Sequence, residues 1–277
     1  MLPVPTPPST TAGSLARRFG TGQLAGVEAG LSLAADLLAG DQDVRPRCAD
    51  LLRRALKGLP AAVCARARVR ADAGYFTAEL AHAAAAAGAD WAIAAKRNSA
   101  FWRELGRGPR NRVDPRPRHA GRAGRGDGLR PGRPPDAYTI VRRVKVDAAD
   151  ISADPRSRRR RTIPADQLAL ALDGELDHAY AVSFIVTNLP TSTAADLAAV
   201  EAWFRRRTDI EERFREAKLG AGRNHLPSGH AGVNTVWMWA ALLAGAISVM
   251  LQTLTGISET RGTARMARLR HELLRVG

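Results

Sequence analysis

A run of fifteen residues, 204–218 (FRRRTDIEERFREAK), carries side chains suited to chemistry on phosphate. Read as one helix, it places four residues at i, i+3, i+7 and i+14: Phe204, Arg207, Glu211 and Lys218. At about 100° per residue these four fall within roughly 60° of arc and share one face. A carboxylate there can ligate a divalent cation while the two basic side chains hold phosphate oxygens. The pattern therefore predicts a metal ion held beside a phosphate.

A second acidic residue, Asp72, follows a predicted strand. Residues 66–95 predict a β-α-β unit, with strands at 67–71 and 91–95 and a helix at 77–87 that Gly88 ends. Asp72 then stands at the carboxyl end of a strand, where α/β sheets place groups that contact ligands. Phosphodiester cleavage by two divalent ions needs carboxylates from different elements. We therefore predict that Asp72 and Glu211 lie close together.

Two separated motifs, in this order along the chain, resemble a known family. RVRADAGYF at 68–76 is similar to the segment that carries the second catalytic aspartate of bacterial insertion-sequence transposases of the DDE class. The 204–218 run resembles their Y-R-E-K signature, with Phe204 in place of the tyrosine. The resemblance extends from SLARRF near residue 14 to the Arg-rich C-terminal helix.

The resemblance implies metal-dependent DNA cleavage and strand transfer on an RNase H-like fold. It implies Asp72 and Glu211 as catalytic residues and as ligands of Mg²⁺ or Mn²⁺ in a two-metal site. Arg207, Lys218 and Phe204 would contact DNA phosphates, although Phe204 keeps only the ring of the family tyrosine. The implied partner is DNA with the element's terminal inverted repeats, and a homodimer is left open.

Both acidic residues also have a purely structural interpretation. Glu211 can pair with an arginine one turn away, Arg207 or Arg215, on an exposed helix. Asp72 can be a turn residue at a strand end. The long spacing match and the motif order favour the catalytic interpretation for both.

The family's first aspartate, expected in an apolar strand upstream, has no counterpart. Asp36 lies within an apolar run, and Asp41 and Asp43 fall in a predicted loop. We therefore expect an internal deletion near Gly30, loss of the central strand, and a catalytically impaired copy. The alternative function is a non-catalytic, basic DNA-binding protein that retains part of the transposase fold.

The chain of 277 residues carries a formal net charge of +15, and nucleic acid is the default partner of so basic a protein. Coding bias in a GC-rich genome is the alternative explanation. Between 103 and 143, twelve arginines face four acidic residues with no hydrophobic period, which predicts a DNA-contacting linker or, as we prefer, a decayed stretch. The run 156–161 predicts a solvated loop or a contact to phosphate.

The predicted fold class is α/β: an RNase H-like mixed sheet flanked by helices, interrupted by a basic β-rich insertion, and incomplete. Strands are predicted at 138–146 and 180–189, short helical patterns over 14–58, and a helix after Asp50 as its N-cap. Five segments are predicted: a lead-in with a remnant helical element (1–30), two parts of the core (31–102 and 179–256), the basic insertion (103–178) and a basic C-terminal helix (257–277).

The apolar run 236–251 is sixteen residues long, shorter than the roughly 20 that span a membrane, and predicts a buried core helix. Two cysteines and an N-terminus without an apolar signal region favour a reducing, cytoplasmic location and no membrane. His225 and His230 have no partner ligands and do not predict a zinc site.

Overall fold

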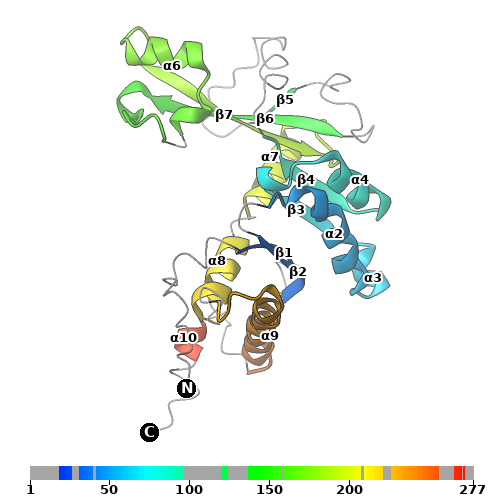
Figure 1. Cartoon of the computed structure of the whole chain (residues 1–277). Coiled ribbons are helices and arrows are strands. Elements are labelled where there is room, and N and C mark those ends of the chain that lie inside the picture. The colour runs from blue at the N-terminus through cyan, green and yellow to red at the C-terminus, as the bar shows by residue number, and fades with distance from the viewer. Residues whose placement is uncertain are drawn as a thin grey trace, which may run out of the picture. The chain divides into compact units, whose positions relative to one another are not determined.

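The computed structural model describes residues 19–26, 31–39, 42–96, 101, 120–123, 137–157, 159–206, 209–220, 226–255, 265–269 and 271. The chain separates into two compact units (Figure 1). The terminal unit combines Met1–Leu59 with Arg207–Gly277, and the central unit is Pro60–Arg206. The boundaries of the five predicted segments stay predictions.

A five-stranded mixed sheet forms the centre of the central unit. In the order β3-β4-β7-β6-β5, its strands are β3 (Arg68–Ala71), β4 (Asp90–Ala94), β7 (His178–Thr187), β6 (Tyr138–Asp147) and β5 (Ala120–Ala123). β3 and β4 run parallel, whereas the other neighbouring pairs are antiparallel. The predicted α/β class, a mixed sheet flanked by helices, is confirmed, and so are both strands predicted near 138 and 180.

The β-α-β unit predicted around Asp72 is also confirmed. Thr77 begins α4 (Ala78–Ala86), because its hydroxyl accepts a hydrogen bond from the Leu80 amide at 3.1 Å. Gly88 follows the helix with a φ of +66°, which a residue without Cβ adopts at little cost. The buried alanines of α4 pack on β4, so the crossover returns the chain beside β3. Asp72 is thereby placed at the carboxyl end of β3.

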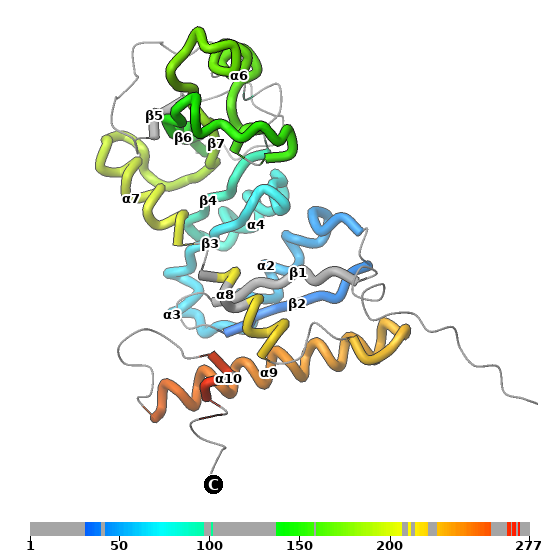
Figure 2. The backbone as a smooth tube through the Cα atoms, turned by 90° about the vertical axis from the view of Figure 1, so that its left-hand side faces the viewer, coloured from blue at the N-terminus to red at the C-terminus, as the bar shows by residue number. Residues whose placement is uncertain are grey.

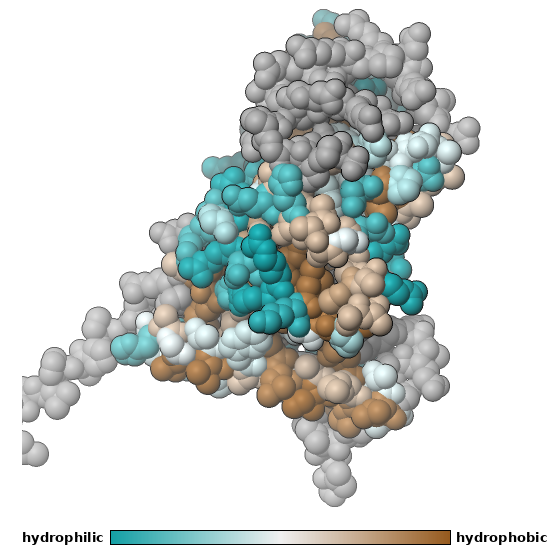
Figure 3. Space-filling view, turned by 90° about the vertical axis from the view of Figure 1, so that its right-hand side faces the viewer, coloured by the Kyte–Doolittle hydropathy of each residue, from teal (hydrophilic) through white to brown (hydrophobic). Residues whose placement is uncertain are grey.

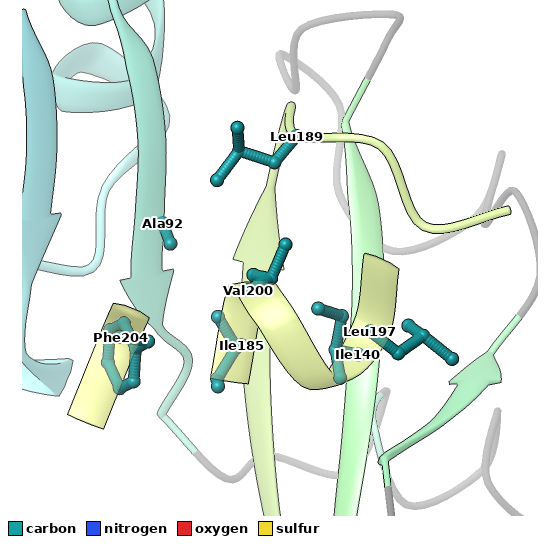
Figure 4. Packing of buried hydrophobic residues seen from close by; sticks show 7 residues of the cluster. All are labelled: Ala92, Ile140, Ile185, Leu189, Leu197, Val200 and Phe204. Carbon is teal, nitrogen blue, oxygen red and sulfur yellow. The ribbon is translucent and has the colours of Figure 1, made fainter. Parts of the chain in front are cut away.

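Helix α7 (Ala194–Arg205) packs on one face of this sheet (Figure 4). Its N-terminus is a capping box in which Thr193 and Asp196 each bond the other's backbone amide. The cluster it completes is buried and joins three strands: Ala92, Ile140, Ile185, Leu189, Leu197, Val200 and Phe204. A second cluster holds α6 (Ala165–Leu172) against β6 and β7: Val146, Ile163, Ala171, Ala179 and Ala181.

The terminal unit begins with a hairpin of β1 (Phe19–Gly26) and β2 (Leu31–Ala39), paired antiparallel. The helical patterns predicted over residues 14–58 are therefore wrong for its first part. Three glycines within β1, FGTGQLAG, explain the outcome, since each costs a helix about 1 kcal/mol relative to alanine. β2 buries Ala34, Ala35 and Leu38.

Two helices pack on β2 in this unit: α2 (Cys48–Lys57) and α9 (Ala231–Thr255). Leu51, Leu52 and Ala55 of α2 are buried, but the helix starts earlier than predicted, with Arg47 as N-cap. Asp50 stands in its first turn and pairs with Arg54 at 2.9 Å. The remaining elements are short: η1 (Arg45–Arg47), α8 (Asp209–Arg215), the π-helical turn Glu216–Gly220 and α10 (Met266–Leu269), and in the central unit α3 (Ala61–Cys64), η2 (Ala73–Tyr75), η3 (Ala148–Asp150) and η4 (Arg160–Thr162).

Helix α9 departs from the buried core helix predicted for its apolar run. By length and composition it could cross a membrane, but within its most apolar stretch only 28% of the residues are buried. One face packs on β2 (Figure 2), and the large apolar residues of the other side are exposed. The physical reason is that the described part of the terminal unit supplies a partner for one face alone.

The basic stretch 103–136 has no hydrophobic period, and decay was the preferred interpretation of it. Four of its residues instead form β5, which pairs antiparallel with β6 at the edge of the sheet. β6 offers an unpaired edge, and backbone hydrogen bonds to it need no hydrophobic period. Residues 102–119 and 124–136 lie outside the described residues.

Candidate active site

Asp72 is exposed at the end of β3 and begins the short helix η2. Its Oδ1 accepts a hydrogen bond from the Gly74 amide at 2.9 Å, which fixes the orientation of the carboxylate. A Cβ at residue 74 would lie 3.0 Å from that oxygen, so glycine leaves room for the turn. The sequence prediction of a strand-end carboxylate is confirmed in position, and the turn interpretation of Asp72 also holds.

The last turn of α7 is held against β3, the strand that carries Asp72. Arg70 donates from its guanidinium to the Trp203 carbonyl at 2.6 Å. The guanidiniums of Arg68 and Arg70 also lie over the Trp203 ring, 5.4 and 5.2 Å from its centroid. This contact was not predicted, although two arginines on one face of a strand and a tryptophan beside the signature run were signals of it in the sequence.

Phe204, next to Trp203, is buried and packs with the α7 cluster against β4 and β7 (Figure 4). Its ring therefore serves the core of the central unit. The loss of the family hydroxyl suits this position, because a phenol buried there would need a hydrogen-bond partner. A contact from Phe204 to DNA stays a prediction.

Glu201 anchors α7 from the side facing β6. It is 6% exposed, accepts a hydrogen bond from Arg142 Nε at 2.6 Å, and accepts two more from Arg205 at 2.8 and 2.9 Å. A buried carboxylate is stable only when paired in this way. The i, i+4 spacing of Glu201 and Arg205 was a signal in the sequence, but Arg142 lies 59 residues away along the chain.

The signature run does not form one helix, and this prediction was wrong. α7 ends at Arg205, α8 begins at Asp209, and a π-helical turn follows from Glu216. No apolar residue stands between Phe204 and Ile210, so this part of the run offers no side chain that would bury a helix against a core. Thr208 is also a residue type that favours the start of a new helix. The shared arc of Phe204, Glu211 and Lys218 was expected from one continuous helix, which the described elements do not form.

Glu211 and Lys218 are both exposed in the terminal unit. Glu211 lies on α8, and Lys218 lies in the π-helical turn. That turn is tied down by Ala217, buried with Ala35, Met238 and Leu242, and by Glu216, whose carboxylate accepts from the Met266 amide at 2.9 Å. Arg207 lies outside the described residues.

The geometry thus presents one exposed carboxylate at a strand end of a mixed sheet and another on a later helix. Compared with protein families, residues 28–277 match the family described as Transposase DDE domain group 1. The chain belongs to this family. Comparison with curated proteins gives no match. The transposase assignment drawn from the two motifs is confirmed, and with it a role in DNA transposition and recombination, for which DNA is the partner the family suggests.

The family implies the use of a divalent metal in general. Carboxylate oxygens such as those of Asp72 and Glu211 are hard ligands that Mg²⁺ and Mn²⁺ accept. Across the described ranges, however, no group of three or more His, Cys, Asp or Glu side chains is placed to hold a metal ion. Asp72 belongs to the central unit and Glu211 to the terminal unit, so their predicted proximity stays a prediction. The carboxylates that the structure describes do not by themselves make a two-metal site.

Two of the three upstream acidic residues considered as a first aspartate are engaged with arginines. Asp36 on β2 accepts from Arg54 at 2.6 Å, a bond that raises the pKa of Arg54. Asp43 accepts from Arg45 Nε at 2.7 Å. Asp41 lies outside the described residues.

The described residues of the basic run 156–161 form a turn that leads into η4 in the central unit. Arg156, Arg159 and Arg161 are exposed, while Arg160 donates to the Ser152 and Ala153 carbonyls at 3.1 and 3.2 Å. The hydrogen bonds of Arg160 tie this segment to the backbone at residues 152 and 153. A shallow pocket beside it is lined by Val146, Asp150, Ile151, Ser152, Ser157, Arg159, Arg160 and Ile163.

Proposed function

We propose that this protein is a transposase of an insertion sequence, of the Y-R-E-K type, in a truncated copy that has lost strand cleavage. Its substrate is the DNA of the element's ends, carrying terminal inverted repeats, and it acts in the cytoplasm as a homodimer. The family match and the order of the two motifs support the transposase part of this proposal. The RNase H-like fold belongs to the same proposal.

The position of β3 carries the proposal of lost activity. β3 leads directly into Asp72, and it is the edge strand of its sheet: among the described strands, β4 alone pairs with it. The hairpin of β1 and β2 forms a separate two-stranded sheet in the terminal unit. A missing central strand would leave these two consequences, an open edge beside the catalytic aspartate and a sheet in two pieces.

Loss of the first aspartate would cost far more than one third of the activity, since residues that act as a unit are not additive. Asp36 and Asp43 are poor replacements, because each already pairs with an arginine. The remaining carboxylates, Asp72 and Glu211, could still hold one metal ion weakly. DNA binding does not depend on this chemistry, and the basic loop 156–161 and the net charge of +15 support it.

Strand cleavage of DNA carrying the element's own ends, with Mg²⁺ or Mn²⁺, tests the proposal. We expect binding of this DNA without cleavage. Asp173→Ala, which removes an exposed acid after α6, is the control. If the parent protein and this control cleave DNA but Asp72→Ala and Glu211→Ala do not, another acid completes the site. The deletion argument would then be wrong, and the transposase assignment would stand.

A further inference from the structure

Helix α9 buries polar residues and exposes apolar ones. Its buried side chains include Asn234, Ser248 and Gln252. Its exposed large apolar side chains are Val233, Val236, Trp237, Trp239, Leu243, Ile247, Met250, Leu251 and Leu254. Leu254 is 84% exposed and Val236 71%, and no residue of α9 is charged. Such a surface is unusual for a protein in water and marks a contact site.

The buried face of α9 is already satisfied within the terminal unit. Asn234 bonds the backbone of Ser228, donating to its carbonyl at 2.8 Å and accepting from its amide at 3.2 Å. Gln252 donates to Ser248 at 3.2 Å. Met238 and Leu242 pack on Ala35 of β2 and on the π-helical turn. These contacts fix the rotation of the helix and direct its apolar stripe outward, where Figure 3 shows hydrophobic surface.

The exposed stripe has the repeat of a coiled-coil seam. Its members follow one another in steps of four, three, four, three and four residues: Val236, Ala240, Leu243, Ile247, Met250 and Leu254. A sustained spacing of 3.5 residues keeps apolar side chains on one line along a helix, where a second helix can interlock with them. Trp237, Trp239 and Leu251 flank the line and are about 40% exposed.

We propose that this stripe is the surface through which two copies of the chain associate, each contributing its α9. That the chain forms a homodimer rests on the proposed function, whereas the exposed apolar stripe is observed whether or not the protein cleaves DNA. At roughly 100 Å² for each exposed large side chain, the stripe and its flanks offer on the order of 800 Å², about what one partner buries in a stable dimer. A two-fold axis sets the same stripe against itself, so each apolar side chain meets another.

Charge favours a second copy at this place. Two chains with a net charge of +15 repel each other over most surfaces, but α9 brings no charged side chain to the contact. A membrane is the weaker candidate, because helices that bind a membrane surface with one face carry a charged polar face, and α9 has no charged residue. One face of α9 is committed to β2 and the π-helical turn, whose Lys218 is exposed.

The test measures the mass of the full-length chain by light scattering after gel filtration. We expect a dimer that Leu243→Glu with Ile247→Glu converts to a monomer, and this monomer should still unfold in one cooperative thermal transition. The matched control, Leu170→Glu with Leu172→Glu on α6, adds two acids at exposed leucines of the central unit and should stay dimeric. A monomeric parent protein, or a dimer that persists in the α9 variant, would overturn the inference.

Disulfide trapping covers the case in which the glutamate variant fails to fold. In a Cys64→Ser background, in which Cys48 is buried, Leu243→Cys and Ile247→Cys are each expected to cross-link two chains, whereas Leu172→Cys is not. Equal cross-linking in all three cysteine variants would contradict the proposal that the α9 stripe is the contact between two chains. Flotation with neutral lipid vesicles by a monomeric parent would instead assign the stripe to a membrane. Loss of DNA binding with an intact dimer would count against the proposed function alone.

Discussion

The carboxylate of Asp72 and the backbone amide of Gly74 form a hydrogen bond of 2.9 Å at the carboxyl end of β3. This bond orients the candidate catalytic oxygen without using both oxygens of the group. A Cβ at residue 74 would stand 3.0 Å from Oδ1, so even alanine must displace the carboxylate. Because Asp72 is exposed, its side chain can move at little cost to the fold.

Gly74→Ala is therefore expected to weaken metal binding at Asp72 while lowering the free energy of unfolding by about 1 kcal/mol or less. Iron(II) and ascorbate cleave a backbone next to a bound metal, and this readout requires no DNA cleavage. We expect cleavage near residue 72 in the parent protein, less in Gly74→Ala and none in Asp72→Asn. Gly58→Ala, where the nearest non-neighbouring atom would be 3.6 Å away, is the control. Identical cleavage in Asp72→Asn would remove Asp72 from the proposed metal ligands.

Glu201→Ala should destabilise the central unit, because it leaves Arg142 without its buried anion. The cost is about 1–3 kcal/mol, below that of a fully buried pair since the arginines are partly exposed. Urea unfolding measures it. Asp50→Ala breaks an exposed i, i+4 pair with Arg54 and should change stability by about 0.5 kcal/mol or less. Equal effects of the two variants would show that the Glu201 network contributes no more than a surface pair.

Local signals in the sequence were sufficient for the β-α-β unit. Thr77 and Gly88 mark the ends of α4 by their own chemistry, and the β-branched runs predicted as strands at 138–146 and 180–189 pair with each other as far as Thr187. The position of Asp72 follows from these elements alone. Nothing about it requires knowledge of distant residues.

The failures of sequence analysis concern contacts between distant residues. The spacing of Phe204, Glu211 and Lys218 fits a straight helix, but the packing of Phe204 on β4 and of Ala217 on β2 divides the run between two units. α9 was predicted to be buried because composition shows hydrophobicity, not what covers it. The contacts of Arg70 with Trp203 and of Arg142 with Glu201 join residues 59 or more positions apart, which no local pattern reveals.

Asp196 gives the central unit a predictable dependence on pH. Hydrogen bonding from the Thr193 amide, at 2.9 Å, lowers the pKa of Asp196. A carboxyl group whose pKa is lower in the folded state stabilises the fold above its unfolded pKa, and this contribution is lost as the pH falls through the folded pKa.

Asp196→Asn should accordingly be less stable than the parent at neutral pH, and the two stabilities should begin to converge as the pH drops below about 3.9. Thermal unfolding between neutral and acidic pH measures the difference. Asp173→Asn, which removes an exposed carboxylate outside the capping box, controls for the change in net charge. A constant difference between Asp196→Asn and the parent at every pH would contradict the linkage.

DNA binding should depend steeply on salt, and the loop 156–161 should account for part of that dependence. Each arginine that contacts a phosphate releases counterions, so log affinity falls with log salt by roughly 0.9 per phosphate neutralised. Replacing Arg156, Arg159 and Arg161 with glutamine should reduce the slope by up to roughly 1 for each residue that contacts phosphate.

The control is a triple variant of exposed cations in and next to α2, Arg47→Gln, Arg53→Gln and Lys57→Gln, which removes the same charge elsewhere. Filter binding across salt concentrations separates the outcomes: a reduced slope in the loop variant alone assigns the contact, and equal reductions in both would show that net charge alone acts. A flat affinity of the parent between low and moderate salt would refute electrostatic DNA binding altogether.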